Sequence, residues 1–161
     1  MKTLAEVTEA TALMNEAVDW SVMKWLTEKK RVRKTADRAN DALWAMQKEV
    51  KARWNADLRI AYDELGKEDD GSASKSAKPS DAKALATSAE LRLLARHIKD
   101  ADDEAWRAHM DAEATFEKAE KILSTSMARE GCRKAIHSWE LYAKAILASE
   151  AAVEAGHARQ E

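Results

Sequence analysis

The sequence predicts an all-α fold, and three observations carry that prediction. The 161 residues are rich in Ala, Glu, Lys, Arg and Leu, with 35% charged residues, a composition typical of long helices and coiled coils. The stretch from Met1 to Leu65 has no glycine and no proline, the two strongest helix breakers. No segment shows the sustained alternation expected of a β-strand. We expect a single domain folded as an elongated antiparallel helical hairpin, or coiled-coil-like bundle.

The first expected element is one very long helix over residues 3–65. At about 1.5 Å per residue, a helix over residues 3–65 would form a rod about 94 Å long. Its apolar positions stay on one helical face throughout at about 100° per residue. These positions are Leu4, Val7, Met14, Val18, Val22, Trp25, Val32, Ala36, Ala39, Leu43, Met46, Val50, Trp54, Leu58, Ala61 and Leu65.

A linker follows over residues 66–81, which hold two of the four glycines and the only proline. Such a composition is typical of an exposed, flexible segment. Ser80 or Asp81 then suits the N-cap of a second helix, expected over residues 82–129.

The apolar pattern loses its phase near Gly131. Extrapolated along one straight helix, the apolar residues on the two sides of this glycine would face in opposite directions. Either the helix ends there, with Gly131 as the residue after the C-cap, or a kinked helix contacts two different partners. We favour a break, followed by a third helix over residues 132–155 that folds back beside the first.

Two charged blocks favour an antiparallel pairing of the long helices. Residues 24–38 are mostly basic and residues 100–117 are mostly acidic. Folding the chain back through the linker brings the blocks opposite each other. Each exposed ion pair stabilises little, about 0–1 kcal/mol, but together the pairs select direction and register.

Several large apolar residues lie outside the main apolar faces, and we interpret them as a possible interaction surface. Exposed clusters of this type usually contact another helix or a partner protein. A third helix could cover some of them and self-association others. They are Leu13, Trp20, Met23, Leu26, Trp44, Trp106 and Met110.

No pattern in the sequence predicts catalysis, a metal site or a cofactor. Glu154-Ala-Gly-His157 is the one Glu-x-x-His match, whereas a di-iron bundle needs two such pairs. Cys132 has no histidine adjacent in sequence and is expected to be a small buried residue at a turn. Phosphate-binding loops, dinucleotide fingerprints and Cys-x-x-Cys pairs do not occur. We therefore expect no enzyme activity and no cofactor.

The function that the sequence favours is that of a structural or adaptor protein. It would act through protein–protein contacts along its helical faces and would self-associate into a homo-oligomer, because an alanine-rich two-helix seam buries little apolar area. An alternative is binding of nucleic acid or an anionic surface through Lys29, Lys30, Arg31, Arg33 and Lys34. The net charge of −2 makes nucleic acid the less favoured partner. A second alternative is a helical bundle that binds a metal or a small molecule.

The cysteine content and the N-terminal residues predict the cellular location. One cysteine cannot form an intrachain disulfide, which favours a reducing compartment. The N-terminal residues do not resemble a signal peptide, and no apolar stretch is long enough for a transmembrane segment. We expect a cytoplasmic protein.

Overall fold

The computed structural model describes residues 2–69 and 82–160, which form five helices and no strand. These are α1 (Lys2–Ala17), α2 (Val22–Ala52), α3 (Ala56–Asp69), α4 (Ala82–Ile122) and α5 (Thr125–Gln160). The predicted all-α class is confirmed. The predicted linker differs in part: residues 66–69 belong to α3, and residues 70–81, with the expected N-cap, lie outside the described residues.

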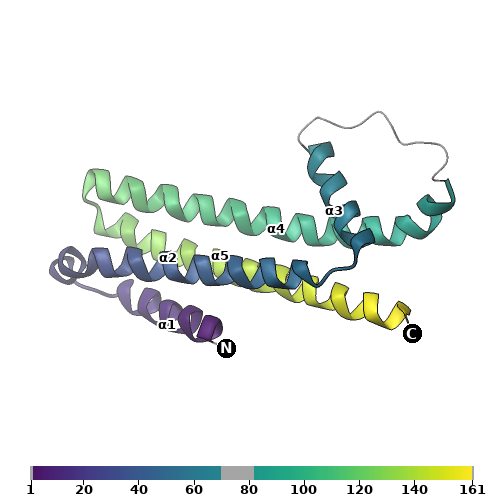
Figure 1. The fold of residues 1–161 in the computed structure, drawn as a ribbon. Helices are drawn as coiled ribbons and strands as arrows, with labels where there is room; N and C mark the ends of the chain where they lie inside the picture. The colour runs from purple at the N-terminus through teal and green to yellow at the C-terminus, as the bar shows by residue number, and fades with distance from the viewer. Residues whose placement is uncertain (1, 70–81, 161) are drawn as a thin grey trace.

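The helices form an elongated bundle (Figure 1). α2, α4 and α5 run lengthwise beside one another, with α4 antiparallel to both of its neighbours. α1 packs on α2 and α5 near one end, and α3 packs across α4 near the other. The longest helix, α4, has 41 residues and spans about 60 Å. Within the described residues, no helix combines the length and the apolar character needed to cross a membrane.

The prediction of one helix over residues 3–65 is wrong, because this stretch folds as α1, α2 and α3. The two breaks are made by capping side chains. Ser21 Oγ accepts a hydrogen bond from the Lys24 amide at 3.2 Å, and Asn55 Oδ1 accepts one from the Leu58 amide at 2.8 Å. A polar side chain that satisfies a first-turn amide starts a new helix without any glycine or proline.

Most of the predicted apolar face is nevertheless buried on both sides of these breaks, although Val22 is 53% exposed. An apolar repeat shows which face each turn buries, but it does not show whether successive turns belong to one helix. The predicted positions that are buried are Met14, Trp25, Val32, Ala36, Ala39, Leu43, Val50, Trp54, Leu58, Ala61 and Leu65.

The expected break at Gly131 is also wrong. α4 ends at Ile122, and α5 begins at Thr125 and continues through the glycine, so the predicted helices 82–129 and 132–155 have the wrong boundaries. Gly131 serves close packing instead. A Cβ at this position would lie 2.8 Å from Cδ1 of Phe116 on α4. The chain reversal at Leu123 and Ser124 accounts for the phase change in the apolar pattern.

Three of the tryptophans join helices through their indole N–H groups. Trp25 donates to the carbonyl of Ala17 at 3.1 Å, and Trp54 donates to the carbonyl of Ser149 at 3.3 Å. Trp139 on α5 donates to Asn40 Oδ1 on α2 at 2.7 Å. All three rings are buried. A buried tryptophan needs an acceptor for its N–H, so these bonds fix how α2 sits against α1 and α5.

Candidate interaction groove between α2 and α4

α2 and α4 run antiparallel, and long side chains bridge them. Arg33 Nη2 lies 3.0 Å from Glu113 Oε2, and Lys51 Nζ lies 2.7 Å from Asp102 Oδ2. Among the described helices, the backbones pack closely in the pairs α4–α5, α1–α2, α2–α5, α3–α4 and α1–α5. The pair α2–α4 is not one of them. The wider spacing of α2 and α4 leaves an open channel, which we call the α2–α4 groove.

Two adjoining pockets make up the groove, and both include Trp44. One has a volume of about 440 Å³ and the other of about 380 Å³. The first is lined by Trp44, Gln47, Lys48, Lys51, Tyr62, Asp102, Asp103, Trp106 and Tyr142. The second is lined by Asp37, Asn40, Asp41, Trp44, His109 and Glu113.

An aromatic cluster forms the middle of the groove. The ring centroid of Trp44 lies 5.8 Å from Trp106, 5.1 Å from His109 and 6.4 Å from Tyr142. Tyr142 is buried, yet 37% of Trp44 and 49% of Trp106 remain exposed, as does 48% of the neighbouring Met110. Packed but half-exposed aromatic rings are the usual anchors of a binding surface.

Carboxylates surround one end of this cluster. Burial raises the pKa of Asp37, and the neighbouring carboxylates of Glu113 and Asp41 raise it further, while Arg33 opposes them. Asp37 and Asp41 are four residues apart on α2, where like charges destabilise a helix. A cationic group entering the groove would relieve this repulsion.

Asp102 connects three helices at the other end of the groove. It accepts hydrogen bonds from Gln47 Nε2 at 2.7 Å, from Lys51 Nζ at 2.7 Å and from the Tyr62 hydroxyl at 2.5 Å. Burial raises the pKa of Tyr62 and the bond to Asp102 raises it further, so the phenol stays protonated as a donor. The Asp102 carboxylate therefore holds α3 and α2 against α4.

His109 predicts a pH dependence of stability. Burial lowers the pKa of its imidazole in the folded protein, despite the opposing effect of Glu113 and Asp37. The neutral ring is favoured in the fold, whereas the unfolded chain takes up a proton near the ordinary pKa of about 6.5. Stability should therefore be full above that pH and fall as the pH drops below it.

Urea midpoints measured between neutral and mildly acidic pH test this expectation. His109→Gln should remove part of the acid-side loss, because the variant has no imidazole to protonate. The exposed His137 provides the control, and His137→Gln should leave the profile unchanged. If His109→Gln had the same pH profile as the wild type, His109 would not be the responsible group.

The structure divides the residues predicted as an interaction surface into three groups. Trp44 and Trp106 line the α2–α4 groove, and Met110 is exposed one helical turn along α4 from Trp106. Met23 and Leu26 are exposed near the start of α2. The remaining two are corrections, because α1, α2 and α5 bury Leu13 and Trp20 in the core.

The predicted basic contacts are similarly divided. Arg33 is half-buried and engaged with Glu113 and Glu120, so it belongs to the fold. This contact shows the expected antiparallel pairing of the basic and acidic blocks. Arg31 lies 3.8 Å from Glu28 within α2. The other three side chains, Lys29, Lys30 and Lys34, are exposed.

Cys132 is fully buried, as expected, but within α5 and not at a turn. Burial raises the pKa of its thiol to about 12, which disfavours the reactive thiolate. In the part of the chain that the structure describes, no three His, Cys, Asp or Glu side chains are arranged to hold a metal ion. The side chain of His157 lies outside the described residues.

Reasoning from the sequence alone missed the polar residues of the groove: Gln47, Lys51, Tyr62, Asp102, His109 and Tyr142. In the sequence, Asp102 is one charge within the acidic block of residues 100–117. Tyr62 returns to α4 only because α3 is separate from α2, and a single helix over residues 3–65 does not allow that geometry. No family model, no curated protein and no solved structure matches this chain.

Proposed function

We propose that this protein is a non-enzymatic adaptor that binds a helical segment of a partner protein in the α2–α4 groove. The observation that supports this most is the half-exposed aromatic cluster of Trp44 and Trp106 between α2 and α4. These two helices are held together by side-chain contacts and not by close packing of their backbones. An amphipathic helix in an apolar groove is a common mode of protein recognition.

The spacing of the groove residues suits a helical partner. On α2, the groove residues are spaced at intervals of four, three and four positions, and they are Asp37, Asp41, Trp44 and Lys48. On α4, the groove residues Asp103, Trp106, His109 and Glu113 follow at intervals of three, three and four. Each set lies along one face of its helix, so the two rows form parallel walls. A helix lying over these two rows would complete a four-helix arrangement with α2, α4 and α5.

The charge of the groove suggests the chemistry of the partner. Its carboxylates outnumber the lysines and arginines that face them, and Arg33 and Lys51 already pair with Glu113 and Asp102. A partner helix should therefore present an apolar anchor, placed on Trp44 and Trp106, between lysines or arginines. Arginine and lysine also interact favourably with exposed aromatic faces.

Synthetic helical peptides test the proposal directly. One has leucine on a single face and lysine or arginine elsewhere, and a second has glutamate in place of every basic residue. The basic peptide should bind at least about tenfold more tightly than the acidic one, because only the first complements the groove. Fluorescence polarisation of labelled peptides measures both affinities.

The variant Trp106→Ser should weaken binding of the basic peptide by about tenfold, since it removes a half-exposed aromatic anchor. Leu147→Ser is the matched control, because Leu147 is also exposed but lies on α5 outside the groove residues. Equal affinity for the acidic peptide, or full binding by Trp106→Ser, would rule out the groove as the binding site.

A second copy of the chain is the competing occupant of the groove. Sedimentation velocity at several concentrations detects self-association, and Trp106→Ser shows whether the groove mediates it. A dimer lost in this variant would assign the groove to self-association. A monomer that binds the basic peptide would support the adaptor function with a separate partner.

A further inference from the structure

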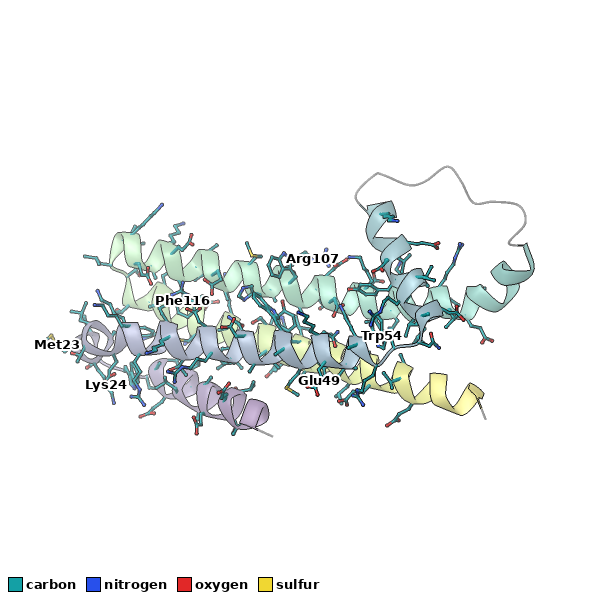
Figure 2. The ribbon with its side chains drawn as sticks, viewed as in Figure 1. Met23, Lys24, Glu49, Trp54, Arg107 and Phe116 are labelled. Atoms are coloured by element: carbon teal, nitrogen blue, oxygen red, sulfur yellow. The ribbon has the colours of Figure 1, made fainter. Side chains whose placement is uncertain are left out.

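A second apolar surface lies at one end of the bundle, away from the α2–α4 groove. We call it the tip, and it consists of Val22, Met23, Leu26, Ile122 and Leu123, all exposed. The start of α2 and the turn between α4 and α5 meet there, and Figure 2 shows Met23 projecting from this end. Met23 is 73% exposed and Leu123 is 75% exposed. Between Leu26 and Leu123 lies an apolar pocket of about 80 Å³ that also contacts Phe116.

The backbone at Leu123 is unfavourable for its residue type. Leu123 has a φ of +52°, in the left-handed region that glycine and asparagine adopt far more readily than leucine. It occupies the position after the end of α4, and the Ser124 amide donates to the Ala119 carbonyl at 3.0 Å, as in a Schellman motif. An exposed leucine contributes little to the fold here, so its apolar side chain is better explained by contact with another surface.

Basic side chains surround the apolar tip. Lys24, Lys29, Lys30 and Lys121 are all exposed. The nearby Glu28 and Glu120 already lie in contact with arginines, at 3.8 Å from Arg31 and 3.4 Å from Arg33. Asp19 and Glu117 are further exposed acidic residues toward this end, but the four lysines outnumber them, so the surface around the tip carries an excess of positive charge.

We propose that the tip docks on an anionic lipid bilayer, a binding function beyond the proposed adaptor role. The apolar side chains would enter the acyl–headgroup boundary, and the lysines would contact the anionic headgroups. Two copies placed tip to tip would bring their lysines together, which disfavours self-association here. A nucleic-acid backbone would attract the lysines but would leave the apolar side chains in water.

Vesicle flotation with the full chain tests this proposal. The protein should float with vesicles of phosphatidylglycerol and phosphatidylcholine and should not float with phosphatidylcholine alone. Binding to the anionic vesicles should fall as salt is raised. Absence of binding to anionic vesicles, or equal binding to both compositions, would overturn the proposal.

The decisive variant is Leu123→Asn, because asparagine suits the left-handed backbone and the variant should fold at least as well as the wild type. Its affinity for anionic vesicles should fall by about tenfold or more. The charge reversal Lys29→Glu with Lys30→Glu should have the same effect. Leu147→Asn is the control, since it removes an exposed leucine from the side of the bundle and should bind normally. Circular dichroism confirms that each variant is folded.

Three results would contradict a lipid partner. Vesicle binding retained by Leu123→Asn would mean that the apolar tip does not enter the bilayer. The protein could instead bind single-stranded DNA at low salt, equally well in Leu123→Asn, and fail to bind vesicles. That result would assign the lysines to nucleic acid. A dimer that Leu123→Asn dissociates, again without vesicle binding, would assign the tip to a second copy. None of these results depends on peptide binding in the α2–α4 groove.

Discussion

Replacing Gly131 with alanine is expected to destabilise the protein by about 1–3 kcal/mol, although alanine is the better helix former. The new Cβ would lie 2.8 Å from one carbon of the Phe116 ring and 2.9 Å from the next. Phe116 is buried, and the Arg33 guanidinium lies 4.8 Å from its ring centroid, so a shift of the ring into the neighbouring pocket would disturb this contact. The clash therefore pushes α4 and α5 apart where Gly131 faces Phe116. Urea unfolding measures the loss.

Gly66→Ala provides the matched control. Gly66 also lies inside a helix, α3, but nothing lies within 4 Å of the Cβ that alanine would add. This variant should gain about 0.5–1 kcal/mol, because alanine loses less backbone entropy on folding. Opposite signs for the two glycines would show that packing, and not helix propensity, decides the outcome at Gly131.

A double-mutant cycle identifies the neighbour responsible for the clash. Phe116→Leu alone should destabilise the protein, but in the Gly131→Ala background it should cost much less, because the smaller side chain makes room for the methyl group. Additive losses would mean that Gly131→Ala acts on something other than the Phe116 ring.

Asp102→Ala should cost about 2–4 kcal/mol, because it removes the acceptor shared by Gln47, Lys51 and Tyr62. The Asp102 side chain is only 14% exposed, so water replaces these bonds poorly. The local loss of stability should be greatest at α3, because α3 packs on α4 and Tyr62 connects it to Asp102. Amides of α3 should exchange with solvent faster in the variant, as hydrogen-exchange mass spectrometry would detect.

Asp100→Ala is the control for this prediction. Asp100 lies two residues away on α4, and its exposed carboxylate is 3.9 Å from an Arg96 nitrogen. Such a contact contributes little, so the variant should lose less than about 0.5 kcal/mol and leave α3 protected. Similar losses for both variants would show that Asp102 does not have the connecting role that the structure gives it.

The helical class and the buried faces could be predicted from the sequence because they depend on local composition and period. The helix ends could not, because Ser21, Asn55 and Ser124 end and restart helices with single polar side chains that look unremarkable in an alanine-rich sequence. The role of Gly131 is hidden in the sequence for a related reason. A glycine signals either a helix end or a close approach, and only the position of Phe116 distinguishes the two.

The candidate site was predictable only in its apolar part. Trp44, Trp106 and Met110 depart from the main apolar faces, and that departure is visible in the sequence. The polar part depends on helix directions, since Asp102 meets Tyr62 only after α3 turns back towards α4. The same geometry separates the tip from the groove, although both include residues that the sequence grouped into one surface.

The short connection between α4 and α5 has a consequence for how the chain folds. Only Leu123 and Ser124 separate these closely packed helices, so forming this hairpin closes a short loop at a small cost in entropy. The contact of Asn40 with Trp139, in contrast, joins residues 99 positions apart. Folding should therefore begin with two local hairpins, α1–α2 and α4–α5, and docking of the two should limit the rate.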